Sequence, residues 1–109
     1  MAISEISVKE LLELSGVQVV DVRETYEYVD GHVPGAISIP LSGIQTRVAE
    51  FPIEGVVYII CQAGGRSQTA CDFLGQQTAL CSTTFINVMG GTGMWILEGG
   101  QVVNGDRPS

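Results

Sequence analysis

The stretch VVYIICQAGGRS, residues 56–67, decides how this chain is expected to fold. It opens with β-branched and aromatic residues, Val56 to Ile60, a composition typical of a strand that is buried on both faces. Cys61 ends this run, and the residues from Ser67 onward, SQTACDFLGQQ, have the composition of a helix. The sequence therefore predicts a strand, a tight loop and a helix, with a thiol at the carboxyl end of the strand.

The loop after Cys61 has the composition of an anion site. Its glycines permit the positive φ angles of a tight curl, and N–H groups at a helix start attract negative charge. Arg66 adds a positive charge, so the thiol pKa should fall and Cys61 should act as a thiolate nucleophile. For Ser67 two roles stay open, the N-cap of the helix and a hydroxyl contact with the sulfur. The predicted binding residues are Gln62, Ala63, Gly64, Gly65, Arg66 and Ser67.

Strand and helix patterns alternate along the rest of the chain. Ser7 and Glu10 fit a capping box for a first helix, which Gly16 should stop. Further strands are expected at 17–22, 36–39 and 83–88, and further helices at 23–28 and 41–51. This alternation predicts a single α/β domain with a mostly parallel sheet, in which ligands bind at the carboxyl ends of strands.

The composition narrows the possible partners and the possible chemistry. Five basic and twelve acidic residues give a net charge of −7, which argues against nucleic acid and anionic membranes as partners. No apolar run reaches the length of a membrane span, and no secretory signal pattern is present, so a cytoplasmic protein is expected. Three cysteines and one histidine support neither a disulfide framework nor a metal site.

Three segments of the chain resemble the rhodanese family of sulfurtransferases in its small single-domain form. They are VVDVRETYEYVDGHVPGAISIP (residues 19–40), CQAGGRS (61–67) and MGGTGMWILEGGQVV (89–103). The resemblance implies a three-layer fold in which helices flank a mostly parallel sheet of about five strands. The resemblance covers about residues 4–103. The length of the chain predicts one domain over residues 1–109, and the polar tail at 104–109 is expected to be frayed.

The resemblance implies a mechanism as well. The Cys61 thiolate takes the outer sulfur of a small anionic donor such as thiosulfate and becomes a persulfide. An acceptor, which is cyanide, a thiol or a protein, then removes that sulfur. No metal or organic cofactor takes part, because the cysteine itself carries the sulfur. The loop amides would stabilise the charge of the persulfide as an oxyanion hole stabilises an oxyanion.

Other polar residues are expected to have supporting or structural roles. Asp21 and Arg23 lie at the carboxyl end of a strand and should support the site without taking part in the chemistry. His32 lies in a turn and is interpreted as structural. Cys71 and Cys81 are interpreted as idle thiols, although either could resolve a persulfide as a disulfide. The run GGTG at 90–93 should form a loop without a nucleotide-binding role, since no lysine follows it.

Two other functions fit the same residues. The first is a sulfur-carrier module that accepts sulfur on Cys61 from a partner protein and turns over thiosulfate poorly, because Arg66 is the one cation between Cys61 and Ser67. The second is a small cysteine phosphatase or arsenate reductase. The spacing Cys-x4-Arg disfavours it, because cysteine phosphatases use Cys-x5-Arg to surround a phosphate.

Overall fold

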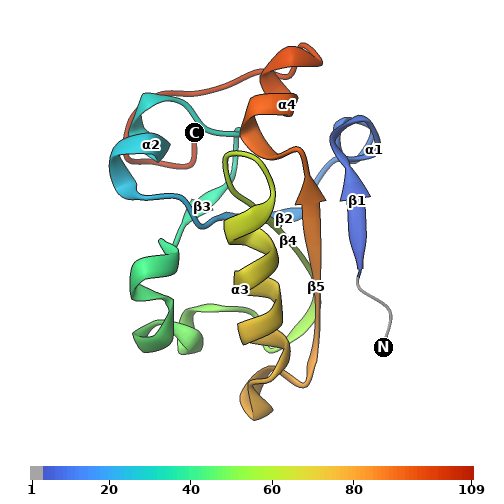
Figure 1. The fold of residues 1–109 in the computed structure, drawn as a ribbon, viewed down its shortest axis with the longest axis vertical. Coiled ribbons are helices and arrows are strands. Elements are labelled where there is room, and N and C mark those ends of the chain that lie inside the picture. Colours follow the sequence, from blue (N-terminus) through green and yellow to red (C-terminus); the bar gives the residue numbers. More distant parts are fainter. Residues whose placement is uncertain (1–3) are drawn as a thin grey trace.

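Five parallel strands form one sheet, in the order β1-β5-β4-β2-β3, in a computed structural model that describes residues 4–109 (Figure 1). The strands are β1 (Glu5–Ser7), β2 (Gln18–Asp21), β3 (Ile37–Ser38), β4 (Glu54–Ile60) and β5 (Ser82–Met89). The predicted α/β fold with a parallel sheet is confirmed. The sequence patterns miss β1, because a strand of three residues is too short to show a period and depends on its pairing with β5.

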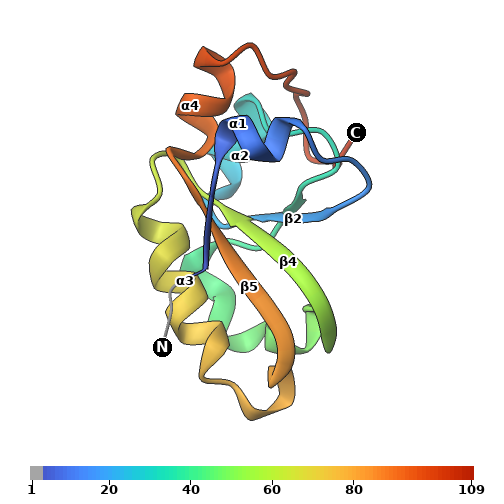
Figure 2. The ribbon, with the colours of Figure 1, turned by 90° about the vertical axis from the view of Figure 1, so that its right-hand side faces the viewer.

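Helices cover both faces of the sheet, which gives the molecule three layers (Figure 2). One face packs against α3 (Gly65–Gly75) and three 3-10 segments, η1 (Leu41–Thr46), η2 (Val48–Glu50) and η3 (Thr78–Leu80). The other face packs against α1 (Val8–Leu12), α2 (Thr25–Asp30) and α4 (Gly91–Leu97).

β4 is the central strand of the sheet, and its side chains alternate between the two cores. Val57 and Ile59 are fully buried in the core on the α3 side. Tyr58 and Ile60 pack into the core on the other side. Because this alternation continues past the strand end, Cys61 belongs to the α3 side of the sheet.

The helix predicted over residues 41–51 is wrong in type. The structure contains two 3-10 segments there, η1 and η2, which are divided at Arg47. The expected apolar side chains still face the α3-side core, with Ile44 and Phe51 buried. A 3-10 turn places residues three apart on one face, which suits Leu41 and Ile44, and a glycine inside the segment weakens an α-helix.

The two ends of the chain depart from expectation in different ways. The capping box of Ser7 and Glu10 is present, with hydrogen bonds of 3.0 and 3.1 Å, but α1 ends at Leu12, well before Gly16. The tail that the sequence predicts to be frayed makes backbone hydrogen bonds, from Gly105 N–H to the Val29 carbonyl and from Gly35 N–H to the Pro108 carbonyl. These contacts tie the tail to α2 and to the turn after it.

Candidate active site

Cys61 directly follows β4, and its sulfur lies inside the loop that leads to α3. The residue is buried, with 1% of its surface exposed. Its Sγ accepts a hydrogen bond from the Gly64 backbone N–H at 3.0 Å and lies 3.3 Å from the Ser67 Oγ. Gly64 has a φ of +115° and is the N-cap of α3. This left-handed turn, which favours glycine, brings the start of the helix over the sulfur.

Two opposing effects act on the pKa of the Cys61 thiol. Burial raises the pKa, because it removes water from the charged thiolate. Hydrogen bonds from the Ser67 hydroxyl and from the backbone N–H groups of Ser67, Gly64 and Ala63 stabilise the thiolate and bring the pKa below its ordinary value. The loop therefore favours the nucleophilic form of the sulfur mainly through hydrogen-bond donors, and not mainly through the charge of Arg66.

Ser67 reaches the sulfur from the first turn of α3. It is not the N-cap, which corrects one of the two roles left open for it, whereas the contact of its hydroxyl with the sulfur is present. Asn87 of β5 holds this hydroxyl through its Oδ1, while its own amide nitrogen lies 3.3 Å from the Gly64 carbonyl oxygen. Sequence reasoning missed Asn87. A lone amide in the buried run TTFINV was the available signal.

Arg66 points to a carboxylate of α2. Its Nη1 and Nη2 donate to the two carboxylate oxygens of Glu27, at 2.7 and 3.0 Å. The Arg66 hydrogen bond is the largest cause that lowers the Glu27 pKa to about 2, and it outweighs the opposing effect of burial. The cation that the sequence predicts to stabilise an anion is thus paired with a charged side chain 39 residues away in the chain.

Asp21 and Arg23 connect the end of β2 to the Cys61 loop. Both are buried, and Arg23 Nη2 lies 2.8 Å from Asp21 Oδ2 in an ion pair. Arg23 also donates to the Gly31 carbonyl at 2.8 Å and to the Gln62 side-chain oxygen at 3.2 Å. Arg23 therefore joins the end of β2 to the side chain of the residue that follows Cys61.

The N-terminus of α4 contacts the same loop from the β5 side. The N–H groups of Thr92 and Gly93 donate to the carbonyls of Cys61 and Gln62, at 2.8 and 3.0 Å. At Gly91, with a φ of +59°, an added Cβ would lie 2.4 Å from the Cys61 carbonyl oxygen. The run 90–93 was expected to be a loop. It is instead the N-cap and first turn of a helix that supports Cys61.

His32 makes the contacts of a structural residue, as the sequence predicts. It is fully buried and stacks on Tyr28, with ring centroids 3.6 Å apart. Its Nδ1 lies 2.8 Å from the Tyr28 carbonyl oxygen, and its Nε2 lies 3.2 Å from the Pro108 carbonyl oxygen. Both ring nitrogens therefore contact backbone oxygens, and neither contacts Cys61.

The other two cysteines differ from Cys61 in environment. Cys71 is half-buried in α3, where burial is the main cause that raises its thiol pKa to about 12. Cys81 is exposed at the end of η3. All three thiols are free, and within residues 4–109 no group of three or more histidine, cysteine or acidic side chains could hold a metal ion.

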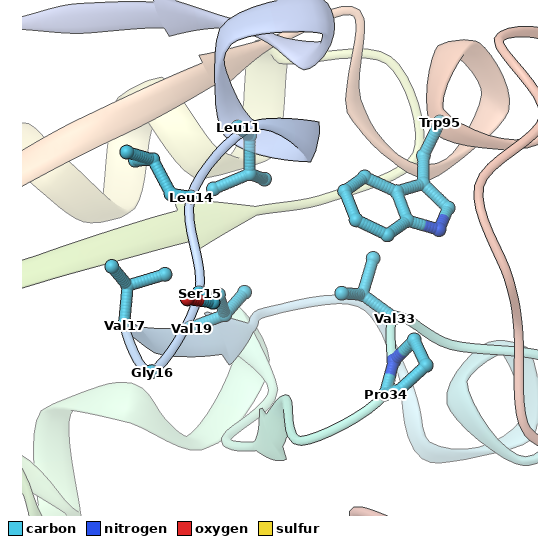
Figure 3. Close-up of a pocket in the computed structure, with 9 residues that line it drawn as sticks. All are labelled: Leu11, Leu14, Ser15, Gly16, Val17, Val19, Val33, Pro34 and Trp95. Atoms are coloured by element: carbon cyan, nitrogen blue, oxygen red, sulfur yellow. The ribbon is translucent and has the colours of Figure 1, made fainter.

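A cavity of about 150 Å³ lies away from the sulfur, between α1, α4 and the turn after α2 (Figure 3). Its wall contains both polar and apolar surface and no charged side chain. The lining residues are Leu11, Leu14, Ser15, Gly16, Val17, Val19, Val33, Pro34 and Trp95. Since Val19, Val33 and Trp95 belong to the core on the other side of the sheet from Cys61, this cavity is not part of the loop site.

The sequence of this chain is similar to those of known proteins. A family model described as a rhodanese-like domain matches residues 5–102. The chain is 33% identical to a sulfurtransferase from Allochromatium vinosum, over 92% of this chain and 91% of that protein. It is 31% identical to the thiosulfate sulfurtransferase GlpE from Pseudoalteromonas translucida, over 71% of this chain and 76% of that protein.

Solved structures agree with the sequence comparison. The crystal structure of a rhodanese-related protein from Thermoplasma volcanium superposes with a TM-score of 0.80 at 31% identity, over 92% of this chain and 97% of that one. A rhodanese-like domain protein from Staphylococcus aureus gives 0.74 at 32% identity, over 85% of this chain and 91% of that one. The chain belongs to the family of rhodanese-like domains.

Proposed function

We propose that this protein is a sulfurtransferase that carries a sulfane sulfur as a persulfide on Cys61. The observation that carries the proposal is the setting of the sulfur, which accepts a hydrogen bond from the Gly64 N–H at 3.0 Å and lies 3.3 Å from the Ser67 hydroxyl oxygen, at the start of α3. Such donors stabilise a thiolate before transfer and a persulfide anion after it. The names of the relatives, a sulfurtransferase and a thiosulfate sulfurtransferase, describe the same class of reaction.

In the first half of the reaction the Cys61 thiolate attacks the outer sulfur of the donor. With thiosulfate, a new S–S bond forms to Cys61 while the S–S bond of the donor breaks. The electron pair of that bond leaves with sulfite. Cys61 then carries a persulfide with one negative charge, which faces the N–H groups at the start of α3.

In the second half an acceptor takes the outer sulfur. Cyanide attacks this sulfur, the bond to Cys61 breaks, and its electron pair returns to the cysteine as a thiolate. The product is thiocyanate. A thiol or a persulfide-accepting protein would react in the same way. Because the enzyme ends in the state in which it began, no net oxidant or reductant is required.

The test is an intact-mass measurement after incubation with thiosulfate in the absence of reducing agent. Wild-type protein should gain one sulfur atom per chain and lose it on addition of cyanide. Cys61→Ser should gain none, and Cys71→Ser should behave as wild type because the raised pKa of that thiol disfavours its thiolate. Sulfur uptake by Cys61→Ser, or uptake that Cys71→Ser abolishes, would overturn the assignment of Cys61.

The sulfur-carrier alternative is favoured by one observation, the pairing of Arg66 with Glu27, which leaves little positive charge for a dianionic donor. A carrier would accept sulfur from a persulfide on a partner protein and show slow turnover with thiosulfate. Steady-state thiocyanate formation separates the two functions.

The phosphatase alternative predicts hydrolysis of an aryl phosphate by wild type and none by Cys61→Ser. We expect no hydrolysis, because the guanidinium that would hold phosphate is occupied by a carboxylate.

A further inference from the structure

The two arginines near the Cys61 loop are both paired with carboxylates. Arg66 binds Glu27 through two hydrogen bonds, of 2.7 and 3.0 Å. Arg23 forms a buried ion pair with Asp21, with a distance of 2.8 Å. A guanidinium that is paired in this way contributes little net positive charge to the space beside it.

Glu27 is held in place by more than its partner. Its Oε1 also accepts a hydrogen bond from the Glu24 backbone N–H at 3.0 Å, as part of the capping box of α2. The carboxylate is 20% exposed and Arg66 is 38% exposed, so the pair lies at the open edge of the site and water reaches it. With a pKa of about 2, the Glu27 carboxylate carries its charge throughout the physiological range.

The consequence for an incoming donor depends on the charge of that donor. Thiosulfate carries two negative charges and approaches a protein whose net charge is −7. The loop N–H groups suit the single negative charge of a persulfide, but they are partial charges and not full ones. The pairing removes the one full positive charge of the loop that could offset the second charge of thiosulfate.

Building on the sulfurtransferase function proposed above, we infer that Glu27 sets the donor preference of the site by pairing with Arg66. The preferred donor is a sulfane-sulfur compound with one negative charge, such as an organic thiosulfonate or a singly charged persulfide, and thiosulfate is disfavoured. Glu27 is therefore a specificity-determining residue that acts through Arg66 and does not touch the reacting sulfur.

The natural probe is a pair of donors that differ in charge and share the same chemistry. Methanethiosulfonate transfers its outer sulfur as thiosulfate does. The Cys61 thiolate attacks that sulfur, the S–S bond breaks, and methanesulfinate leaves with the electron pair in place of sulfite. The two reactions differ by one negative charge on the donor and one on the leaving group. The ratio of their kcat/KM values therefore reports how the site responds to donor charge.

The experiment measures this ratio, with thiocyanate formation as the readout, for wild type, Glu27→Gln and Glu50→Gln. Glutamine keeps an oxygen for the Glu24 N–H but carries no charge. Glu50 is a matched control, because it forms the same two-bond pair with Arg47 at an exposed site outside the Cys61 loop. We expect Glu27→Gln to raise kcat/KM for thiosulfate roughly 3- to 10-fold more than for methanethiosulfonate, with the gain shrinking at high salt. Glu50→Gln should match wild type.

A second measurement does not depend on sulfur transfer. The Cys61 thiolate is alkylated with iodoacetate, which is an anion, and with iodoacetamide, which is neutral. Mass spectrometry of the peptide that contains Cys61 gives both rates. Glu27→Gln should raise the ratio of the iodoacetate rate to the iodoacetamide rate, whereas a purely structural role would change both rates by the same factor.

The possible outcomes separate this inference from the function on which it rests. Sulfur transfer with donor ratios and alkylation ratios equal in wild type and Glu27→Gln would overturn the inference and leave the sulfurtransferase intact. A parallel loss with both donors would also overturn it, because Glu27 would then only support the fold. If wild type transfers sulfur from neither donor, the proposed function fails and the donor preference fails with it.

Discussion

The two neighbouring units β4–α3 and β5–α4 have the same backbone plan and use it in different ways. In each, a glycine in the left-handed region, Gly64 or Gly90, is the N-cap of the helix. In the first unit the loop N–H groups point to the sulfur of Cys61. In the second, the N–H groups of Thr92 and Gly93 donate to carbonyls of the Cys61 loop. A helix start thus becomes an anion site only where its N–H groups have no carbonyl partners nearby.

The second unit supports the first. Its helix start lies so close to the Cys61 loop that a side chain at Gly91 would overlap the carbonyl oxygen of Cys61. At the equivalent position of α3, Gly65, an added Cβ would meet nothing within 4 Å. The start of α4 is therefore packed against backbone, whereas the space beside Gly65 in the first turn of α3 is open.

The largest expected effect comes from adding a side chain at Gly91, where the start of α4 is packed against the Cys61 loop. Gly91→Ala should lower the free energy of unfolding by about 2–4 kcal/mol, because the new methyl group overlaps backbone and the residue has a left-handed φ. Gly65→Ala is the matched control and should change stability by less than about 1 kcal/mol. Urea unfolding of the three proteins gives the comparison. Equal stability of the two variants would show that the contact between the units is loose.

A smaller effect should follow from changing a donor of the first unit alone. Ser67→Ala removes the hydroxyl that contacts the sulfur, so the pKa of Cys61 should rise. The rate of Cys61 alkylation by iodoacetamide at pH 7 should then fall roughly fivefold, as expected for the loss of one hydrogen bond. Thr69→Ala is the control, since that hydroxyl bonds the Gly65 carbonyl and not the sulfur. An unchanged pH profile of alkylation would contradict this prediction and show that the backbone N–H groups alone keep the pKa of Cys61 low.

The smallest expected effect concerns the charged side chains, which only the first of the two helix starts carries. The folded-state pKa of Glu27 is about 2, below its ordinary value of 4.5, so its pair with Arg66 stabilises the fold above about pH 4.5. This contribution should disappear as the pH falls toward 2. The stability difference between wild type and Glu27→Gln should therefore shrink over that range. A difference that stays constant with pH would contradict the pairing.

Within residues 4–109, no helix has the length and apolar character to cross a bilayer. The cavity beside α1 and α4 has no charged side chain and no thiol in its wall.

The sequence by itself determined the central features of this protein. The apolar run before Cys61 predicts the buried strand, and the glycines after it predict the tight loop, because both depend on local chain properties. The Ser7 capping box was predicted for the same reason. The pattern of apolar residues at 41–51 correctly predicted which side chains are buried, although the helix type was wrong.

Tertiary structure alone decided which partners these residues find. Arg66 lies in the same short loop sequence as Cys61, yet its carboxylate partner is Glu27 of α2. Asn87 reaches Ser67 because β5 lies next to β4, and the tail is held because it returns to α2. Such contacts join residues that are far apart in the chain. Local sequence patterns do not show which distant residues come into contact. The packing of the sheet and its helices therefore determines which carboxylate pairs with each arginine near Cys61.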